Sequence, residues 1–553
     1  MASLIPGTVQ AIDVRGTFNN VRHAHGQQDT ILIPQPSADP EDPLNWSDKR
    51  KLLNVISQCL YTFCTAIMIA SLSSAYLLME KDTGISLANI NTGTGLEYLF
   101  LGWCNVFWQP IAINYGRRPV LLISMVGTCA ISLWTACVKS TGEWYANRIL
   151  QGFFLAPIET LVEICIADIF FSHQRARWMA TYTWTLFCGP FLGPVAAGFV
   201  ADRFGWQWVQ YVVCCIGWPA TLIVFFTLEE TMFFRRTVQE EALIEFETKT
   251  SDPVLKGLDG TKSPDTPATT EKAADTRPEA ATGAADHAGE VGSTYPRKSY
   301  RQKLKVWGFR AKGQPNTFLK DVVLPFTLVR FPAMVFAGLL VGSILSWFNV
   351  VNGTVALILG SAPYSFSAEM IGVAYISCVI GVSVGCFLSG HLSDWIARYM
   401  ARRNNGVREP EHRLWLALIP MVIHPVGCIL YGVGAAHHVH WVGVLFGLGL
   451  ICVCLPMGTS VAFNYIMDCY KEVAGEGIVT AILFRNTMGF AFAYAVVPMI
   501  NGIGLQDSFI LLAFLGMGFW GLSLPMIMFG KTFRKHTAMA YWRMVEQHGL
   551  TIH

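Results

Sequence analysis

The chain has 553 residues, of which 52% are hydrophobic and 14% are charged, with a mean hydropathy of +0.40. Soluble globular proteins carry about 25% charged residues, so this composition excludes an ordinary soluble domain and favours a membrane protein. The 15 cysteines are scattered, mostly inside apolar runs, and no CxxC pair or Cys/His metal spacing occurs. No HExxH, GxSxG or comparable catalytic pattern occurs either. We therefore expect no metal, no cofactor, no nucleic-acid partner and no enzyme activity.

Apolar runs of about 20 residues, long enough to cross a bilayer, recur along the whole chain. They predict about twelve transmembrane helices and an all-α membrane protein. The polar N-terminus has no basic-then-apolar signal peptide. The predicted spans are 53–79, 92–113, 119–138, 145–170, 177–200, 207–228, 325–359, 367–391, 413–435, 440–466, 477–499 and 507–530.

Basic residues predict the orientation of these spans. The connections on the side of residue 1 hold most of the arginines and lysines, whereas the opposite side holds little beyond Lys81, Lys139 and Arg203. Since Lys and Arg favour cytosolic loops, both termini are expected in the cytosol, including the tails 1–50 and 531–553. We expect an integral multi-pass protein of the plasma membrane.

The central segment 229–321 interrupts the series of spans. Residues 256–290 are rich in Thr, Ala, Asp, Pro and Gly and almost free of large apolar residues, a composition that cannot bury a core. A largely disordered cytosolic loop is predicted, separating a six-helix half at 51–228 from another at 322–530, as in a two-halved transporter. The basic segment 297–307 is either an interfacial helix or a solvated linker.

The span 145–170 carries more ionisable residues than a membrane helix normally tolerates. Each such residue at the bilayer centre costs about 2.5–3.5 kcal/mol, so several in one span predict a cavity, a partner charge or a substrate. At about 100° per residue, Glu159 and Glu163 lie roughly 20° and 60° around the helix from Arg148, while Asp168 lies roughly 200° away. The first three therefore share a predicted cavity face, although about 16 Å of rise prevents a direct Arg148–Glu159 pair.

The two glutamates are the predicted substrate and proton residues. Burial raises the pKa of a carboxyl group and a nearby cation lowers it. A carboxyl that is protonated when the site is empty can therefore release its proton when a cationic substrate arrives, which is a minimal antiport mechanism. The alternative is a structural pair, hydrogen-bonded to neighbouring spans.

Further polar residues extend the candidate site. Asn54 and Gln58 follow one face of the first span, and Glu97 is either a second acidic site or a group that reaches the interface. Arg485 lies about 12 Å inside its span and needs a partner. The span 440–466, the counterpart of 145–170, has no acid in its middle, which places the charged chemistry in the first half.

Two short segments occupy the same position in the two halves, Gln109–Pro119 and Gly390–Arg398. Together they resemble the GxLxDRxGRR loop of the major facilitator superfamily, which latches neighbouring helices on the cytosolic side. The first copy has Ile113 in place of the family's aspartate, and the second has Ala397 in place of its second glycine. The predicted latch residues are Gly116, Arg117, Arg118, Asp168, Gly390, Asp394 and Arg398. Topology signals alone would also account for the arginines.

A Gly/Pro run in the span 177–200 resembles the GPxxGPxxGG motif of proton-coupled antiporters, with Ala197 at the penultimate position. Such residues are tolerated in membrane helices that pack closely against neighbours, so a purely packing role is the alternative. The residues that carry this resemblance are Gly189, Pro190, Gly193, Pro194 and Gly198.

The segment Arg148–Gly152 matches the superfamily's RxxQG signature, and the order Ala156-Pro-Ile-Glu159 with Glu163 and Asp168 is similar to a fungal drug:proton antiporter branch. This branch includes polyamine and cation transporters as well as metabolite or drug exporters. The resemblance implies a monomer that exports a small organic molecule, with cations among the candidate substrates, in exchange for protons by alternating access. Uptake of organic cations such as polyamines is the alternative. A channel would need a filter or pore-lining repeat, and none is visible.

Overall fold

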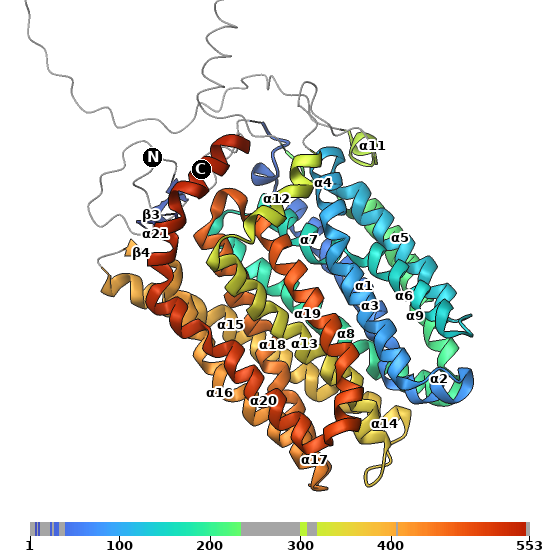
Figure 1. The fold of residues 1–553 in the computed structure, drawn as a ribbon. Helices are drawn as coiled ribbons and strands as arrows, with labels where there is room; N and C mark the ends of the chain where they lie inside the picture. The colour runs from blue at the N-terminus through green and yellow to red at the C-terminus, as the bar shows by residue number, and fades with distance from the viewer. Residues whose placement is uncertain are drawn as a thin grey trace, which may run out of the picture.

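The computed structural model describes residues 6–7, 9–10, 23–24, 27–31, 39–233, 299–306, 318–404 and 407–548. Within these ranges the chain is a bundle of long helices (Figure 1), which confirms the predicted all-α membrane fold. Eleven helices of the described ranges are long and apolar enough to cross a membrane. Most of the central segment predicted to be disordered, including 256–290, lies outside the described residues.

The first group of helices forms the blue-to-green side of the bundle (Figure 1). The predicted second span is divided at Cys104 into α3 of 17 residues and α4 of 11 residues. Each piece alone is too short to be one of the eleven membrane-crossing helices, but together they supply the twelfth crossing. The elements are η1 (Pro43–Asn45), α1 (Asp48–Ala70), η2 (Ser71–Ala75), α2 (Tyr76–Thr83), α3 (Leu87–Trp103), α4 (Asn105–Tyr115), α5 (Arg117–Thr135), α6 (Thr141–Leu155), α7 (Pro157–Ile169), α8 (Ser172–Phe204) and α9 (Trp206–Thr227).

The second group forms the yellow-to-red side (Figure 1). Its elements are α11 (Tyr300–Lys303), α12 (Phe318–Leu328), α13 (Pro332–Gly360), α14 (Ala368–Ala374), α15 (Ile376–Arg403), η4 (Pro410–Ala417), α16 (Leu418–Cys428), η5 (Ile429–Val433), α17 (Gly434–Ala436), α18 (Trp441–Cys469), η6 (Lys471–Val473), α19 (Ala474–Ile503), α20 (Leu505–Gly521) and α21 (Ser523–His548). Four short strands pair as β1 (Val9–Gln10) with β4 (Val407–Arg408) and β2 (His23–Ala24) with β3 (Gln27–Ile31).

Three predicted boundaries were wrong. The span predicted at 325–359 is α13 alone, preceded by the separate helix α12. The helix of the span predicted at 367–391 continues to Arg403, because no helix-breaking residue stands after Gly390. The last helix, α21, likewise continues beyond 530 through part of the predicted tail to His548.

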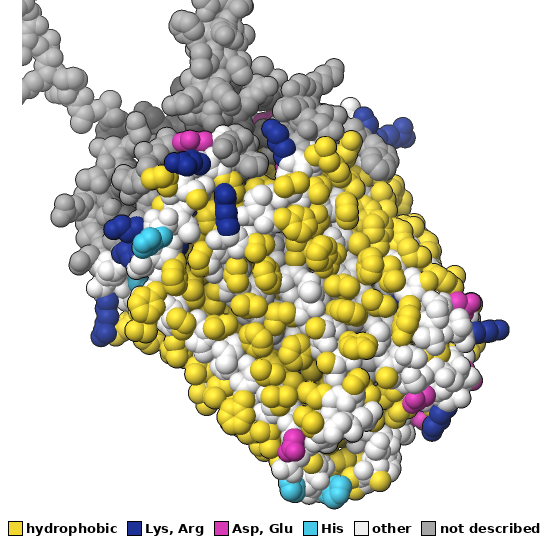
Figure 2. Space-filling view, in the orientation of Figure 1, with side chains coloured by type: hydrophobic (Ala, Val, Ile, Leu, Met, Phe, Trp, Pro, Cys, Tyr) yellow, Lys and Arg dark blue, Asp and Glu magenta, His cyan; other side chains and the backbone are white. Residues whose placement is uncertain are grey.

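The two faces of the bundle differ in charge. We call the face at which α1 begins and α21 ends the terminal face, and the face with α2, α14 and α17 the opposite face (Figure 1). Figure 2 shows a broad apolar belt between them and most of the visible Lys and Arg side chains toward the terminal face. Exposed side chains such as Leu222, Phe387 and Phe446 belong to this apolar surface, as expected for a surface that faces lipid.

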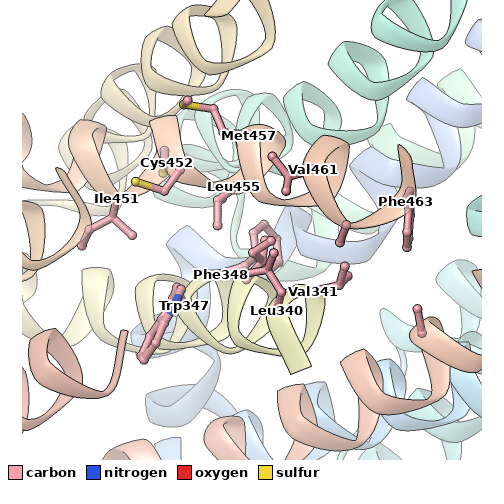
Figure 3. Packing of buried hydrophobic residues seen from close by; sticks show 14 of the residues in the cluster. Leu340, Val341, Trp347, Phe348, Ile451, Cys452, Leu455, Met457, Val461 and Phe463 are labelled. Carbon is pink, nitrogen blue, oxygen red and sulfur yellow. The ribbon is translucent and has the colours of Figure 1, made fainter. Parts of the chain in front are cut away.

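Close helix packing holds the interior together. Figure 3 shows buried side chains of α13 and α18, among them Phe348 and Leu455, that pack between the two helices. Where α15 meets α18, a Cβ atom at Gly381 would lie 2.3 Å from the Gly449 carbonyl oxygen. Lipid is as apolar as these side chains, so small residues that allow such close approach are a main source of helix association in membranes.

Pro157 explains why the charged span divides into α6 and α7. Proline has no N–H, so the carbonyl of Phe153, four residues earlier, loses its helical donor. The Trp108 indole donates to this oxygen at 2.8 Å, and Ser124 Oγ donates to the neighbouring Phe154 carbonyl at 2.6 Å. Neighbouring helices thus satisfy the backbone groups that the break leaves open.

Candidate functional site

Arg148 and Glu97 form a buried ion pair between α6 and α3. Arg148 Nη1 lies 2.9 Å from Glu97 Oε2, and its Nη2 donates to Thr135 and Asn147 at 2.8 Å each. The guanidinium also lies over the Trp144 ring, 4.4 Å from its centroid. Glu97 is fully buried, so the alternative that it reaches the membrane interface is wrong. Buried charges are stable only when they are paired in this way.

Glu159 pairs with a different partner, contributed by the second group of helices. An ion pair joins its Oε1 to Arg485 Nη2 of α19, and Asn486 Nδ2 donates to Glu159 Oε2 at 3.3 Å. Arg148 and Glu159 therefore belong to two separate ion pairs, although they share one predicted helix face. The sequence indicates that Arg485 needs a partner but does not identify Glu159.

Glu163 lies one turn from Glu159 and is 5% exposed. Its Oε2 has no hydrogen-bond partner among the described residues. Arg175 of α8 is the cation that acts electrostatically on this carboxyl group. Of the two predicted glutamates, Glu163 therefore keeps the greater free hydrogen-bonding capacity.

A cavity lies between the two groups of helices, close to the Glu159–Arg485 pair. Apolar and aromatic side chains dominate its wall, and Arg485 is its charged group. The lining residues are Ile69, Tyr98, Leu186, Phe187, Pro190, Ile344, Leu345, Phe348, Thr459 and Arg485.

Asn54 and Gln58 lie outside the lining of this cavity. Gln58 Nε2 donates to Asn54 Oδ1 at 2.5 Å, and Asn54 Nδ2 donates to the Glu229 carbonyl at 3.1 Å, near the terminal face. Both side chains are buried. Their spacing along α1 correctly indicates a shared face, but that face contacts the end of the first helical group rather than the cavity.

The first predicted latch begins at Gly116, which separates α4 from α5. Its φ of +111° is a conformation that glycine adopts without strain. Arg117 forms an ion pair with Asp168 at the end of α7, and the Glu230 carboxylate accepts the backbone N–H groups of Arg117 and Arg118 at 3.1 and 3.0 Å. Two acids from outside the motif, Asp168 of α7 and Glu230 after α9, therefore contact its arginines, whereas the motif itself has Ile113 instead of aspartate. Asp168 and Glu230 thus supply negative charge beside Arg117 and Arg118. The gating role of the latch residues stays a prediction.

The second predicted latch has a different geometry. Gly390 and Arg398 lie within the continuous helix α15 rather than in a loop, Arg398 is exposed, and the Asp394 side chain lies outside the described residues. An ion pair that matches Arg117–Asp168 occurs elsewhere: Arg413 Nε lies 3.2 Å from Asp468 Oδ2 at the end of α18. The candidate list lacked this pair, although Asp168 and Asp468 end corresponding spans, a signal that the sequence contains.

The Gly/Pro run in α8 contacts both groups of helices. A Cβ atom at Gly189 would lie 2.6 Å from Ala66 Cβ of α1, and one at Gly193 would lie 3.1 Å from the Ile67 carbonyl. On the opposite face, a Cβ atom at Gly198 would lie 2.5 Å from the Ala368 carbonyl of α14. Pro190 and Pro194 stand inside the uninterrupted helix. The glycines thus serve close packing, which both interpretations of the motif require.

Comparisons with known proteins give the same fold and family. The family model of the Major Facilitator Superfamily matches residues 59–498. The chain is 29% identical to the uncharacterized MFS-type transporter C1271.10c of Schizosaccharomyces pombe, over 93% of this chain and 90% of that protein. It is 24% identical to the multidrug transporter TPO1_2 of Candida glabrata, over 91% and 78%.

Among solved structures, the proton:xylose symporter XylE superimposes with a TM-score of 0.56, covering 87% of this chain and 96% of XylE. The sequences are 10% identical, so this similarity concerns the fold alone. The shared fold includes both groups of helices described above.

Proposed function

Because the chain belongs to the Major Facilitator Superfamily, whose members are membrane transporters and not enzymes, we propose that it exports a small organic molecule in exchange for protons by alternating access. The observation that carries this proposal is the Glu159–Arg485 ion pair, which joins the two groups of helices beside a mainly apolar cavity. In two-halved transporters the substrate site lies near the membrane midplane, between the moving halves. An ionic link at this position can couple protonation to movement.

The coupling follows from the energetics of buried charge. Removing one partner of a buried ion pair costs about 3–5 kcal/mol, because the other charge is left uncompensated. Protonation of Glu159 has the same electrostatic effect, since it leaves Arg485 without an opposite charge. A proton that enters this site would therefore weaken the link between the halves and favour a conformation in which Arg485 finds other partners. Glu163, one turn away, is the second proton candidate.

The cavity wall favours a substrate with a substantial apolar body, such as a drug, toxin or secondary metabolite. Tyr98 and Phe348 supply aromatic surface, and Thr459 supplies a hydroxyl group. Apolar pockets with a few polar groups are typical of sites for small organic ligands. The name of the Candida glabrata relative, a multidrug transporter, agrees with this substrate class.

The proposal places the terminal face in the cytosol and the protein in the plasma membrane as a monomer. The support for this orientation is the concentration of Lys and Arg side chains toward the terminal face (Figure 2), because such residues favour the cytosolic side. The halves would then be 51–228 and 322–530, linked by the segment 229–321.

Uptake of organic cations such as polyamines is the second candidate function. The buried Glu163 favours it, because one carboxylate oxygen has no hydrogen-bond partner among the described residues. A cationic substrate could supply that partner. The positive charge of Arg485 on the cavity wall disfavours polycations and places this function second.

The first test identifies a transported compound and the direction of transport. Deletion and overexpression strains are compared for resistance and uptake across polyamines, cationic drugs and secreted metabolites. Resistance gained on overexpression supports export, whereas sensitivity gained supports uptake.

The second test uses that compound in vesicles with an imposed pH gradient. Glu159→Gln removes the titratable group but keeps its shape, so proton-coupled flux should be lost while surface expression stays normal. Glu143→Gln, an exchange of an acid at the start of α6 near the opposite face, is the control and should transport normally. Unchanged flux in Glu159→Gln would refute the proposed coupling.

A further inference from the structure

Buried polar residues lie just beyond the central cavity, toward the opposite face. Asn352 stands one turn beyond the cavity residue Phe348 on α13, and Asn91 stands two turns beyond Tyr98 on α3. Ser73, in η2 directly after α1, follows Ile69 by four residues. Spacings of four and seven residues keep a helical side chain on the same face, displaced by about 6 and 10 Å along the axis. The cavity wall thus continues into a polar region.

Contacts of these residues and their neighbours connect α2 with α3, and α3 with α13. Tyr76 Oη lies 3.1 Å from Thr94 Oγ1 of α3, one turn from Asn91, and the buried Ser73 and Tyr375 hydroxyl groups have no hydrogen-bond partner among the described residues. A Cβ atom at Gly353, the neighbour of Asn352, would lie 3.3 Å from the Asn91 side-chain nitrogen. We call Ser73, Tyr76, Asn91, Asn352 and Tyr375 the polar layer. It joins the two halves, because Asn352 and Tyr375 belong to the second.

The polar layer has hydrogen-bonding capacity that the described residues do not use. Asn352 and Asn91 are each 4% exposed. Neither the side-chain oxygen nor the side-chain nitrogen of Asn352 has a hydrogen-bond partner among the described residues, and the side-chain nitrogen of Asn91 has none either. Buried polar groups in native proteins are nearly always paired, so each exception requires an explanation. Asn352 also begins an Asn-Gly-Thr sequence, but its burial inside α13 is incompatible with a glycosylation site.

A series of aromatic rings leads from the central cavity to Tyr375 of the polar layer. The Phe348 ring lies 5.9 Å from Tyr98 and 5.3 Å from Phe191, and Phe191 lies 6.3 Å from Tyr375, measured between ring centroids. These rings come from α3, α8, α13 and the loop before α15, so they belong to both halves. Movement of the halves would displace these rings and open the polar layer to the cavity.

We propose that the polar layer is a second substrate subsite, which binds neutral hydroxyl, carbonyl or amide groups on the substrate. All five of its side chains are neutral, and their hydroxyl and amide groups supply both donors and acceptors. The nearest carboxylate, Glu97, is balanced in charge by Arg148, although its Oε1 has no hydrogen-bond partner among the described residues. A polycation would require carboxylates whose charge is not already balanced, so the subsite selects an amphipathic molecule whose apolar body occupies the central cavity.

This inference rests on the proposed function, since it requires transport through the opposite face. Its first test is therefore independent of any substrate. Asn352→Cys and Asn91→Cys variants are treated with a membrane-impermeant charged maleimide in intact cells, and labelling of the wild-type cysteines is subtracted. Both variants should be labelled when the halves open toward the opposite face.

Ser346→Cys is the matched control. Ser346 is also buried on α13, but it bonds the Gly342 carbonyl of its own helix at 2.8 Å and lies on another face. Its variant should stay unlabelled. If Asn352→Cys and Asn91→Cys are labelled no more than Ser346→Cys, the polar layer does not face the transport path and the subsite is refuted.

The second test measures selectivity in proteoliposomes with an imposed pH gradient. Chloramphenicol, a neutral molecule with hydroxyl and amide groups, is compared with tetraphenylphosphonium, an apolar cation without them. Asn352→Leu should lower chloramphenicol transport about fivefold, the effect of losing one neutral hydrogen bond, with little change for tetraphenylphosphonium. Asn352→Ser, which keeps a hydroxyl group, should retain more chloramphenicol transport than Asn352→Leu.

The outcomes separate this inference from the proposed function. An equal loss for both probes in Asn352→Leu would refute the selectivity of the subsite while leaving proton-coupled export intact. If the wild-type protein transports neither probe under a pH gradient, proton-coupled export of these probe classes fails, and the labelling experiment alone decides whether the polar layer belongs to the transport path.

Discussion

The two halves of the molecule agree at the terminal face and differ in the middle of the membrane. Arg117 pairs with Asp168 at the end of α7, and Arg413 pairs with Asp468 at the end of α18. Mid-membrane, the first half holds Glu97, Arg148, Glu159 and Glu163, whereas α18 has no acid at the positions that correspond to Glu159 and Glu163. The second half contributes Arg485 instead.

This difference separates two roles that charge has in the protein. The matched pairs at the terminal face lie at helix ends, where water lowers the cost of a charge. The mid-membrane charges are buried, so each depends on one specific partner. A repeated feature is expected to serve the movement of both halves, whereas an asymmetric one is expected to serve the substrate or the proton.

The largest expected effect concerns the buried Arg148–Glu97 pair. Arg148→Leu leaves the Glu97 carboxylate buried without its partner, so the free energy of unfolding should fall by about 3–5 kcal/mol. The measurement is a denaturant titration of the purified protein in detergent. The double variant Arg148→Leu with Glu97→Leu should recover much of the loss, because no unpaired charge remains.

Arg203→Leu, at an exposed position on the opposite face, is the control for that comparison and should change stability by less than about 0.5 kcal/mol. If the double variant is as unstable as Arg148→Leu, the two side chains stabilise the protein by packing rather than as an ion pair. The difference between the halves at mid-membrane would then not be electrostatic in origin.

A smaller effect is expected where the halves meet at the opposite face. Gly198→Ala places a Cβ atom 2.5 Å from the backbone oxygen of Ala368, so α8 and α14 must separate, at a cost of about 1–3 kcal/mol. Gly390→Ala, in a helix position with no atom within 4 Å of the added Cβ, is the matched control. Thermal unfolding of both variants measures the difference, and equal stability would show that the close contact is unimportant.

The smallest effect is expected for the matched ion pairs at the terminal face. The four side chains of Arg117–Asp168 and Arg413–Asp468 are 13–26% exposed, and such partly exposed pairs contribute about 0.2–1 kcal/mol. A double-mutant cycle to alanine measures the coupling energy of each pair. Similar values would support equivalent roles, whereas coupling in only one pair would limit the latch to that half.

Much of the architecture could be predicted from the sequence, because a membrane span needs a long apolar run and satisfied backbone groups. The spans, the charged face of the helix at 145–170 and the need of Arg485 for a partner all follow from local pattern. The boundaries near 325, 391 and 530 did not follow, because hydropathy does not distinguish a membrane helix from its continuation into a polar helix.

The sequence by itself determined which residues are too costly to leave unpaired: Arg148, Glu159, Glu163 and Arg485. Only the tertiary structure decided the pairing, because the partners come from helices far apart in the chain. In the structure, Arg148 pairs with Glu97 and Glu159 pairs with Arg485. It also placed Asn54 and Gln58 outside the cavity lining and brought Asn91 next to the helix that carries Asn352. Helical periodicity fixes the face on which a side chain lies, whereas the packing of other helices fixes what that face contacts.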